Sequence, residues 1–202
     1  MKGLPFEDGE CFMNIGVLAL QGDFEEHSIC LRKLGVRVRE VRLPSHLDGL
    51  DGLIIPGGES TTIGKLATDY RLVSPILEFA KSESIWGTCG GLVLMARDVG
   101  MRQPILGLID MTVERNAFGR QVDSFEENLE IENLHGGPFR GVFIRAPRVT
   151  RVGSGVKVLC KLKDGSIVAV RQGRFLATSF HPELTNDSRL HAYFLEMISK
   201  RD

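Results

Sequence analysis

The order of apolar runs and helical stretches in the first half of the chain constrains its fold more than any other feature. Asn14–Leu20 and Leu53–Ile55 are short apolar runs typical of buried strands, and Phe24–Leu34 has its apolar residues at helical spacing. Gly35 follows this stretch where a C-cap glycine belongs. Strands that alternate with helices through short glycine-rich joints form parallel βαβ units. The pattern therefore predicts an α/β fold with a mostly parallel central sheet and helices on both faces.

The second half of the chain is richer in strand patterns than the first. Further first-half strands are expected at 36–41 and 85–86, and helices from about 61, at 72–81 and at Leu92–Val99. Second-half strands are expected at 129–131, 142–144, 156–162, 167–170 and 175–180. Asp164-Gly165 is a hairpin turn between two of them, and a last amphipathic helix has Asn186 or Asp187 as its cap. These patterns predict a single domain over residues 14–202, after a flexible N-terminal extension over 1–13.

Composition excludes several classes of protein. The net charge of -1 and the lack of a basic block give no electrostatic support for binding nucleic acid. No apolar run approaches the roughly 20 residues of a membrane span, and the N-terminus lacks a secretion signal, so a cytoplasmic protein is expected. The four cysteines are far apart and form no C-x-x-C pair, so neither a zinc knuckle nor a dithiol redox pair is expected.

Gly87-Thr88-Cys89-Gly90-Gly91 joins a predicted strand to a predicted helix. This is the pattern of a nucleophile elbow, with cysteine in place of serine. The glycines allow a tight turn, and the residue at its centre stands at a helix N-terminus, where the dipole and free N–H groups favour a thiolate. A lone cysteine is more often a small core residue, but this setting makes Cys89 the candidate nucleophile. The other three cysteines have no such setting.

His181-Pro182-Glu183 follows the predicted strand at 175–180. A residue before proline favours an extended conformation, and residues i and i+2 of an extended chain project to the same side. Glu183 is therefore predicted to hold one ring nitrogen of His181 while the other nitrogen faces the Cys89 thiol, as in a nucleophile–base–carboxylate triad. A parallel sheet would bring both motifs to its carboxyl edge. The remaining histidines lack the spacing of a metal site, so no metal is expected.

Six sequence blocks carry a resemblance to a known family, in order from about Asn14 to the end of the chain. They are LALQG at Leu18–Gly22, GLIIPGGESTT at Gly52–Thr62, GTCGGL at Gly87–Leu92, ERNAFGRQVDSFE at Glu114–Glu126, VFIRAP at Val142–Pro147 and ATSFHPELT at Ala177–Thr185. The cysteine elbow and HPE occur throughout class I glutamine amidotransferases. PGGEST, RNAFGRQ and FIRAP narrow the match: the chain resembles the glutaminase subunits of pyridoxal 5'-phosphate synthase.

The resemblance implies a flavodoxin-like three-layer α/β fold and a catalytic triad of Cys89, His181 and Glu183. It implies that L-glutamine is hydrolysed to glutamate and ammonia through a glutamyl thioester, with no cofactor. The ammonia would pass to a partner synthase subunit, in a hetero-oligomeric complex, for pyridoxal 5'-phosphate (vitamin B6) biosynthesis. The chain itself shows neither a P-loop nor a phosphosugar site.

A glutamine pocket is also implied by the resemblance. Its residues would be Gly58, Glu59, Ser60, Arg115, Ile144 and Arg145. Glu59 has the charge to bind the ammonium of glutamine, and one of the two arginines has the charge to bind its carboxylate, but the sequence does not say which. The N–H groups of Gly58 and Gly90 would form the oxyanion hole, the kind of donor that stabilises a tetrahedral intermediate.

One departure and two alternatives accompany this interpretation. The family usually has alanine after the nucleophile, whereas this chain has Gly90, which keeps the N–H and allows a more flexible elbow. One alternative is a related elbow-cysteine peptidase or chaperone, but the peptidase relatives have histidine at this position. The other is a catalytically silent regulatory or binding subunit, which the complete Cys-His-Glu set disfavours.

Overall fold

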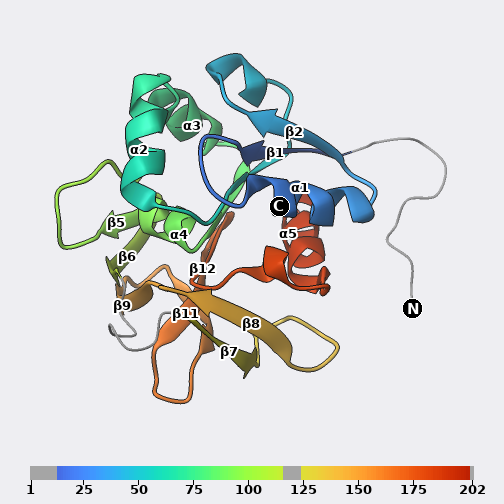
Figure 1. The fold of residues 1–202 in the computed structure, drawn as a ribbon, viewed down its shortest axis with the longest axis vertical. Helices are drawn as coiled ribbons and strands as arrows, with labels where there is room; N and C mark the ends of the chain where they lie inside the picture. Colours follow the sequence, from blue (N-terminus) through green and yellow to red (C-terminus); the bar gives the residue numbers. More distant parts are fainter. Residues whose placement is uncertain (1–12, 116–123, 201–202) are drawn as a thin grey trace.

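The computed structural model describes residues 13–115 and 124–200 (Figure 1). The helices are α1 (Phe24–Lys33), α2 (Ser60–Asp69), α3 (Val73–Phe79), α4 (Gly90–Met95) and α5 (Arg189–Ser199), with 3-10 turns η1 (Pro44–Leu47) and η2 (Pro182–Leu184). Within the described ranges, no helix is both long and apolar enough to cross a membrane. The extension predicted over 1–13 lies, except for Met13, outside the described residues, so it and the domain boundary stay predictions.

The strands form one large sheet and one small one. They are β1 (Asn14–Leu18), β2 (Arg37–Val41), β3 (Gly52–Ile55), β4 (Ser84–Thr88), β5 (Ala96–Asp98), β6 (Ile109–Glu114), β7 (Ser124–Leu129), β8 (Phe139–Ile144), β9 (Arg148–Val152), β10 (Lys157–Lys161), β11 (Ile167–Gln172) and β12 (Phe175–Thr178). The ten-stranded sheet has the order β2-β1-β3-β4-β12-β11-β9-β6-β5, with β10 also paired to β11, while β7 and β8 pair separately.

The half of the sheet from β2 to β12 is parallel, and it carries the elbow. Every neighbouring pair in the series β2, β1, β3, β4, β12 is parallel. Beyond β12 the strands change direction, because β11 is antiparallel to β12, β9 and β10. Parallel strands need crossover connections, which α1, α2 and α3 supply, whereas the antiparallel strands β10, β11 and β12 follow one another through short links. The predicted α/β fold is confirmed in this parallel half.

Alternate side chains of the parallel strands enter two separate hydrophobic cores. Ile54 of β3 packs into a core with Leu31 of α1 and the apolar face of α5. Its neighbours Leu53 and Ile55 face the opposite way, into a core built with α2, α3 and α4. Figure 1 shows α2 and α3 on one side of the sheet and α1 and α5 on the other. All four residues of β3 are buried, as expected of a strand covered on both faces, and the three-layer architecture is confirmed.

Three predictions about individual elements were wrong. The helix expected over Leu92–Val99 ends at Met95, because Ala96 turns to extended geometry and pairs with Ile109 as the start of β5. Strand pairing here overrides local helix propensity. Of the strand expected at 129–131, only Leu129 belongs to a strand, β7. The N-cap of α5 is Ser188 and neither predicted residue, although Asp187 Oδ1 accepts the N–H of Arg189 at 3.0 Å.

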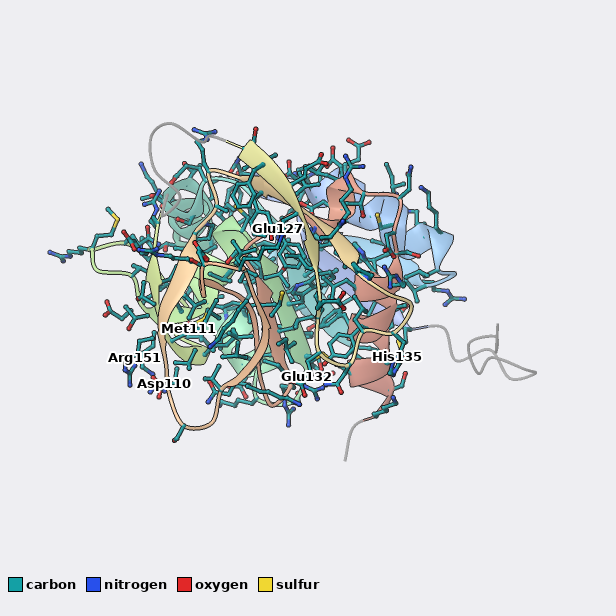
Figure 2. The ribbon with its side chains drawn as sticks, turned by 90° about the horizontal axis from the view of Figure 1, so that it is seen from below. Asp110, Met111, Glu127, Glu132, His135 and Arg151 are labelled. Carbon is teal, nitrogen blue, oxygen red and sulfur yellow. The ribbon has the colours of Figure 1, made fainter. Side chains whose placement is uncertain are left out.

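Two strands of the antiparallel half, β6 and β9, were not predicted. β6 alternates buried and more exposed residues, a period-two signal that the sequence does contain. It pairs antiparallel with β9, placing Thr112 opposite Arg151. Figure 2 shows Asp110 of β6 and Arg151 of β9 close together in this part of the sheet, with Arg151 Nη1 3.3 Å from Asp110 Oδ1. The expected hairpin at Asp164-Gly165 does join β10 to β11.

The separate β7–β8 ribbon closes over the core on the α1 and α5 side. Phe143 of β8 stacks on Phe125 of β7 and contacts Phe180, which follows β12. Phe139 of β8 also contacts Phe180, with ring centroids 5.9 Å apart. The ribbon thus packs against the segment that leaves β12 and leads to the HPE motif.

Gly91 provides a test of how tightly the elbow packs on the sheet. A Cβ atom at residue 91 would lie 2.0 Å from the carbonyl oxygen of Ile55, so Gly91→Ala must displace either α4 or β3. We expect this substitution to lower the free energy of unfolding by about 1–3 kcal/mol, measured by urea titration. Gly155→Ala is the control, because its Cβ would meet only one side-chain atom, at 3.4 Å. Equal stability of both variants and the wild type would contradict this packing.

Candidate functional site

Cys89 lies at the sharp turn between β4 and α4. Its φ of 45° and ψ of -103° fall where L-residues are rarely found, which is the strain expected at a nucleophile elbow. A hydrogen bond to the neighbouring strand β12 holds the turn: the Cys89 N–H donates to the Thr178 carbonyl oxygen at 2.8 Å. Only a small part of Cys89 is exposed, and its Sγ faces the Ile144 carbonyl oxygen at 3.9 Å. Since α4 has only six residues, the groups that surround the sulfur matter more than the helix dipole.

The register of two parallel strands brings His181 to Cys89. β12 pairs with β4 so that Thr178 lies opposite Thr88, the residue before Cys89. The chain continues past Thr178 for three residues to His181, whose N–H donates to the carbonyl oxygen of Val142 in β8 at 2.8 Å. β12 and β8 therefore fix the backbone that carries the imidazole.

The His181 ring is buried between a thiol and two carboxylates. Its Nδ1 lies 2.7 Å from Glu183 Oε1 and 3.2 Å from Asp23 Oδ2. Burial by itself lowers the pKa of His181, but hydrogen bonds to Asp23, Cys89 and Glu183 outweigh it and raise the pKa to about 12. The ring is therefore an imidazolium at neutral pH, poised beside the Cys89 sulfur, and an imidazolium stabilises a neighbouring thiolate.

Glu183 reaches His181 by a route that differs from the predicted one. The sequence suggested an extended chain with both side chains on one face, but Glu183 lies in the 3-10 turn η2, which begins directly after His181. The turn folds the carboxylate back under the ring, where it is fully buried. Burial raises the pKa of Glu183, while its hydrogen bond with His181 works in the opposite direction. The buried carboxylate and the imidazolium thus hold one proton between them.

A pocket of about 360 Å³ opens above the sulfur of Cys89. The residues predicted for glutamine binding and the oxyanion hole share this pocket: Gly58, Glu59, Ser60, Gly90, Arg115, Ile144 and Arg145 all line it. Cys89 and His181 form part of its wall, whereas Glu183 does not. The structure therefore brings together residues from five separate sequence segments.

Glu59 and Arg115 form a fixed pair at one side of the pocket. Arg115 Nη2 lies 2.6 Å from Glu59 Oε1, and the other Glu59 oxygen accepts the N–H of Thr62 at 2.7 Å as the N-cap of α2. Burial by itself raises the pKa of Glu59, but several hydrogen bonds from Thr62 and Thr61 together outweigh it and lower the pKa to about 2. Glu59 is therefore a permanent negative charge at the rim.

Comparison with known proteins gives the family. A family model described as the SNO glutamine amidotransferase family matches residues 17–200. The chain belongs to this family. It is 55% identical to the pyridoxal 5'-phosphate synthase subunit PdxT of Herpetosiphon aurantiacus, over 91% of this chain and 99% of that protein. It is 56% identical to the PdxT subunit of Thermus thermophilus, over 91% and 96% of the two chains.

A solved structure agrees with this family. A crystal structure described as a glutamine amidotransferase superposes with a TM-score of 0.87 at 54% identity, covering 92% of this chain and 98% of that one. The resemblance drawn from the sequence blocks is thereby confirmed at the level of the family, and the fold is confirmed with it. The roles of individual residues in the pocket remain predictions.

Gly90, the departure from the family pattern, lies against the other predicted oxyanion residue. A Cβ at residue 90 would lie 2.3 Å from the Gly58 carbonyl oxygen and 3.2 Å from the Gly58 nitrogen. The usual alanine would thus force the turn at Gly58 to move away from the elbow. The glycine lets the two backbones approach more closely than the family alanine would in this conformation.

Two residues at the pocket were not predicted as parts of the site. Asp23 was given no role, yet its carboxylate contacts the His181 ring and its N–H donates to the Gly57 carbonyl oxygen at 3.2 Å. Gln21 was not assigned to the pocket either, but its Oε1 accepts the N–H of Glu59 at 2.8 Å and so holds the glycine turn. The LALQG block contains Gln21, so the resemblance could have indicated this residue. Asp23 lies just after the block, and no motif indicated it.

One group of side chains has the composition of a cation site. Among the described residues, the ligand atoms of Asp23, His181 and Glu183 lie within 4.8 Å of one another. His181 Nδ1 and Glu183 Oε1 are 2.7 Å apart, which is a charge-assisted hydrogen-bond distance. A proton already occupies the position that a cation would need, so this arrangement fits a catalytic base better than a metal centre.

Behind Glu183 lie two fully buried histidines, His27 of α1 and His191 of α5. His27 Nδ1 is 3.0 Å from His191 Nε2, and both rings contact Trp86. Burial, reinforced by the charges of His191 and His181, lowers the pKa of His27 well below its usual value. Burial alone lowers the pKa of His191 to about 3. Both rings are neutral at neutral pH, unlike His181.

The neutral histidines make stability depend on pH. Below about pH 6.5 the unfolded chain protonates His191 but the folded chain does not, so folding loses up to about 1.4 kcal/mol per pH unit at this site. His181, whose pKa is raised, is already protonated in the folded state over this range. The free energy of unfolding of His191→Gln, minus that of the wild type, should therefore increase steadily as the pH falls from about 6.5 to about 5. Urea unfolding at each pH measures this difference, and parallel curves for the two proteins would contradict a neutral His191.

Proposed function

We propose that Cys89, His181 and Glu183 hydrolyse the side-chain amide of L-glutamine, and that the ammonia passes to a synthase subunit that makes pyridoxal 5'-phosphate. Membership of the SNO glutamine amidotransferase family and the names of the PdxT relatives support the reaction and the partner. The observation that carries the assignment to residues is one arrangement. Cys89, at a strained turn, and the His181 ring share the wall of a pocket, and the far nitrogen of that ring is 2.7 Å from the buried Glu183 carboxylate.

The reaction begins with attack of the Cys89 sulfur on the side-chain carbonyl carbon of glutamine. His181 holds the proton that the thiol gives up, and Glu183 stabilises the resulting imidazolium. The tetrahedral intermediate collapses as His181 transfers that proton to the leaving nitrogen, which departs as ammonia and leaves a glutamyl thioester. Neutral His181 then takes a proton from water, and the hydroxide attacks the thioester and releases glutamate. Covalent catalysis of this kind requires neither a metal nor an organic cofactor.

The negative oxygen of the intermediate needs nearby N–H donors. We assign this role to the amides of Gly58 and Gly90, whose backbones adjoin beside Cys89. The Gly57 carbonyl oxygen, in the peptide that also carries the Gly58 N–H, accepts a hydrogen bond from the N–H of Asp23 at the start of α1. Because C=O and N–H point in opposite directions across a trans peptide, this bond turns the Gly58 N–H away from α1. Each donor of this type contributes on the order of 10²–10³ to the rate.

The charges of the pocket suit the two ends of an amino acid. Glu59 is ionised and would attract the ammonium group of glutamine. Arg115 is committed to Glu59, Thr61 and Gln103. Arg145 lines the same pocket, is exposed, and makes no hydrogen bond or ion pair with the described residues. We therefore assign the carboxylate of glutamine to Arg145 and assign to Arg115 the task of holding Glu59.

The location and assembly of the protein follow from the same proposal. Ammonia is protonated in bulk water, so it must reach the synthase within a complex of the two subunits. The cysteines of the described residues, Cys30, Cys89 and Cys160, are free, which suits the reducing cytoplasm. We place the complex there.

Replacing Cys89 tests the proposed reaction. Cys89→Ala should lower glutamine hydrolysis by about 10³-fold or more, because no other group can form the thioester. With the synthase subunit present, the variant should also lose pyridoxal 5'-phosphate formation from glutamine but keep formation from added ammonium. Cys160→Ala is the control, since burial raises the pKa of this core thiol to about 11 and it lies outside the pocket. Unchanged glutamine hydrolysis by Cys89→Ala would sink the assignment.

Replacing Arg145 tests the orientation of glutamine in the pocket. Arg145→Met should raise the KM for glutamine by about 10- to 100-fold, the contribution of a charged hydrogen bond, with a smaller change in kcat. Arg148→Met is the matched control, because Arg148 pairs with Glu114 and does not line the pocket. A normal KM in Arg145→Met together with a raised KM in Arg115→Met would show that Arg115, and not Arg145, binds the carboxylate of glutamine.

A further inference from the structure

The two oxygens of Glu183 have different surroundings. Oε1 accepts the short hydrogen bond from His181. Oε2 is buried and has no well-aligned hydrogen-bond partner among the described residues, yet His27 Nε2 lies only 3.3 Å away. Both side chains are 0% exposed. A buried carboxylate oxygen without a donor is costly, so the nature of this contact matters for the triad.

The hydrogen-bond chain decides which nitrogen of His27 carries the proton. If Nε2 were bare, its lone pair would face the carboxylate, and His191 Nδ1 would carry a buried N–H with no described acceptor. With the proton on Nε2, His27 Nδ1 accepts the N–H of His191 Nε2 at 3.0 Å, and only the bare acceptor His191 Nδ1 lacks a partner. Orphaned buried donors are rarer in proteins than orphaned acceptors. His27 therefore presents an N–H to Glu183.

That N–H lies between two acceptors. His27 Nε2 is 3.1 Å from Thr88 Oγ1 and 3.3 Å from Glu183 Oε2, so the contact with the carboxylate is bent. Thr88 is the residue before Cys89, so the same ring touches both the strand that ends in the nucleophile and the carboxylate of the base. His27 therefore contacts both the residue before Cys89 and the carboxylate that holds His181.

His27 is held in place by aromatic packing. Its ring meets Trp86 edge-on, with centroids 5.6 Å apart, and His191 at 5.2 Å, and those two rings also contact each other. The low pKa of the ring keeps it uncharged. A neutral donor orients the carboxylate without cancelling its charge, so the full negative charge of Glu183 remains available to the His181 imidazolium.

We propose that His27 is a positioning residue of the triad: its Nε2–H holds the second oxygen of Glu183 and thereby fixes the orientation of His181 toward Cys89. This inference rests on the proposed glutaminase function. His27 does not line the pocket. Its loss should therefore affect the rate of the chemical step and leave the binding of glutamine unchanged.

Three substitutions at residue 27 separate positioning from packing. Gln can place an amide N–H near the position of Nε2, Asn reaches only as far as Nδ1, and Leu offers no donor. In the full chain in complex with the synthase subunit, His27→Leu and His27→Asn should lower kcat for glutamine by about 10- to 100-fold with KM unchanged. His27→Gln should recover most of kcat, because it restores the donor to Glu183.

Phe194→Leu is the matched control. Phe194 packs against Trp86 in the same aromatic cluster, with centroids 5.6 Å apart, but it makes no hydrogen bond to the triad. It should lower the melting temperature and leave kcat unchanged, which shows that instability alone does not lower the rate. If His27→Leu does not fold, the His27→Gln and His27→Asn pair decides the question.

Equal kcat values for His27→Gln and His27→Asn, or a rise in KM without a fall in kcat, would overturn the positioning role. These outcomes differ from failure of the proposed function. If the wild type does not hydrolyse glutamine, or if Cys89→Ala still does, the triad itself is wrong. If hydrolysis depends on Cys89 but not on a donor at residue 27, only the inference about His27 falls.

Discussion

The register between β4 and β12 is the constraint on which the site depends. Because the strands are parallel and Thr88 lies opposite Thr178, the elbow and the HPE motif leave the same edge of the sheet. The hydrogen bond from the Cys89 N–H to the Thr178 carbonyl oxygen then fixes the strained turn to the neighbouring strand. A slip of one residue would reverse the faces of β12 and move His181 away from Cys89.

The buried groups around Glu183 differ in charge. Glu183 and His181 form a charged pair, whereas His27 and His191, only one layer further in, are neutral. Glu183 therefore has a charged partner on the side of Cys89 and the neutral ring of His27 on the other. This asymmetry directs its charge toward His181, the ring that lies beside Cys89.

The pocket depends on close approaches between backbones that only glycine permits. The Gly58 turn lies against Gly90 at the elbow, while Gln21 and Asp23 hold the same turn from the end of β1. The separate β7–β8 ribbon contributes Ile144 to the same pocket, and Arg115, which follows β6, also lines it. The pocket is thus built from the parallel half of the large sheet, the segment after β6 and the separate ribbon.

The sequence alone determined the features that depend on neighbours along the chain. The alternation of strands and helices in the parallel half, the elbow around Cys89, the position of the HPE motif after β12 and the hairpin at Asp164-Gly165 are local patterns, and these lie where they were expected. Tertiary structure decided what depends on distant residues. Met95 ends α4 because Ala96 pairs with β6, and Glu183 turns back through η2 instead of extending. His27, an ordinary buried residue of an amphipathic helix in the sequence, becomes a neighbour of Glu183 only when α1 packs beside η2. Burial and pairing are properties of segments far apart in the chain, and a local pattern carries no record of them.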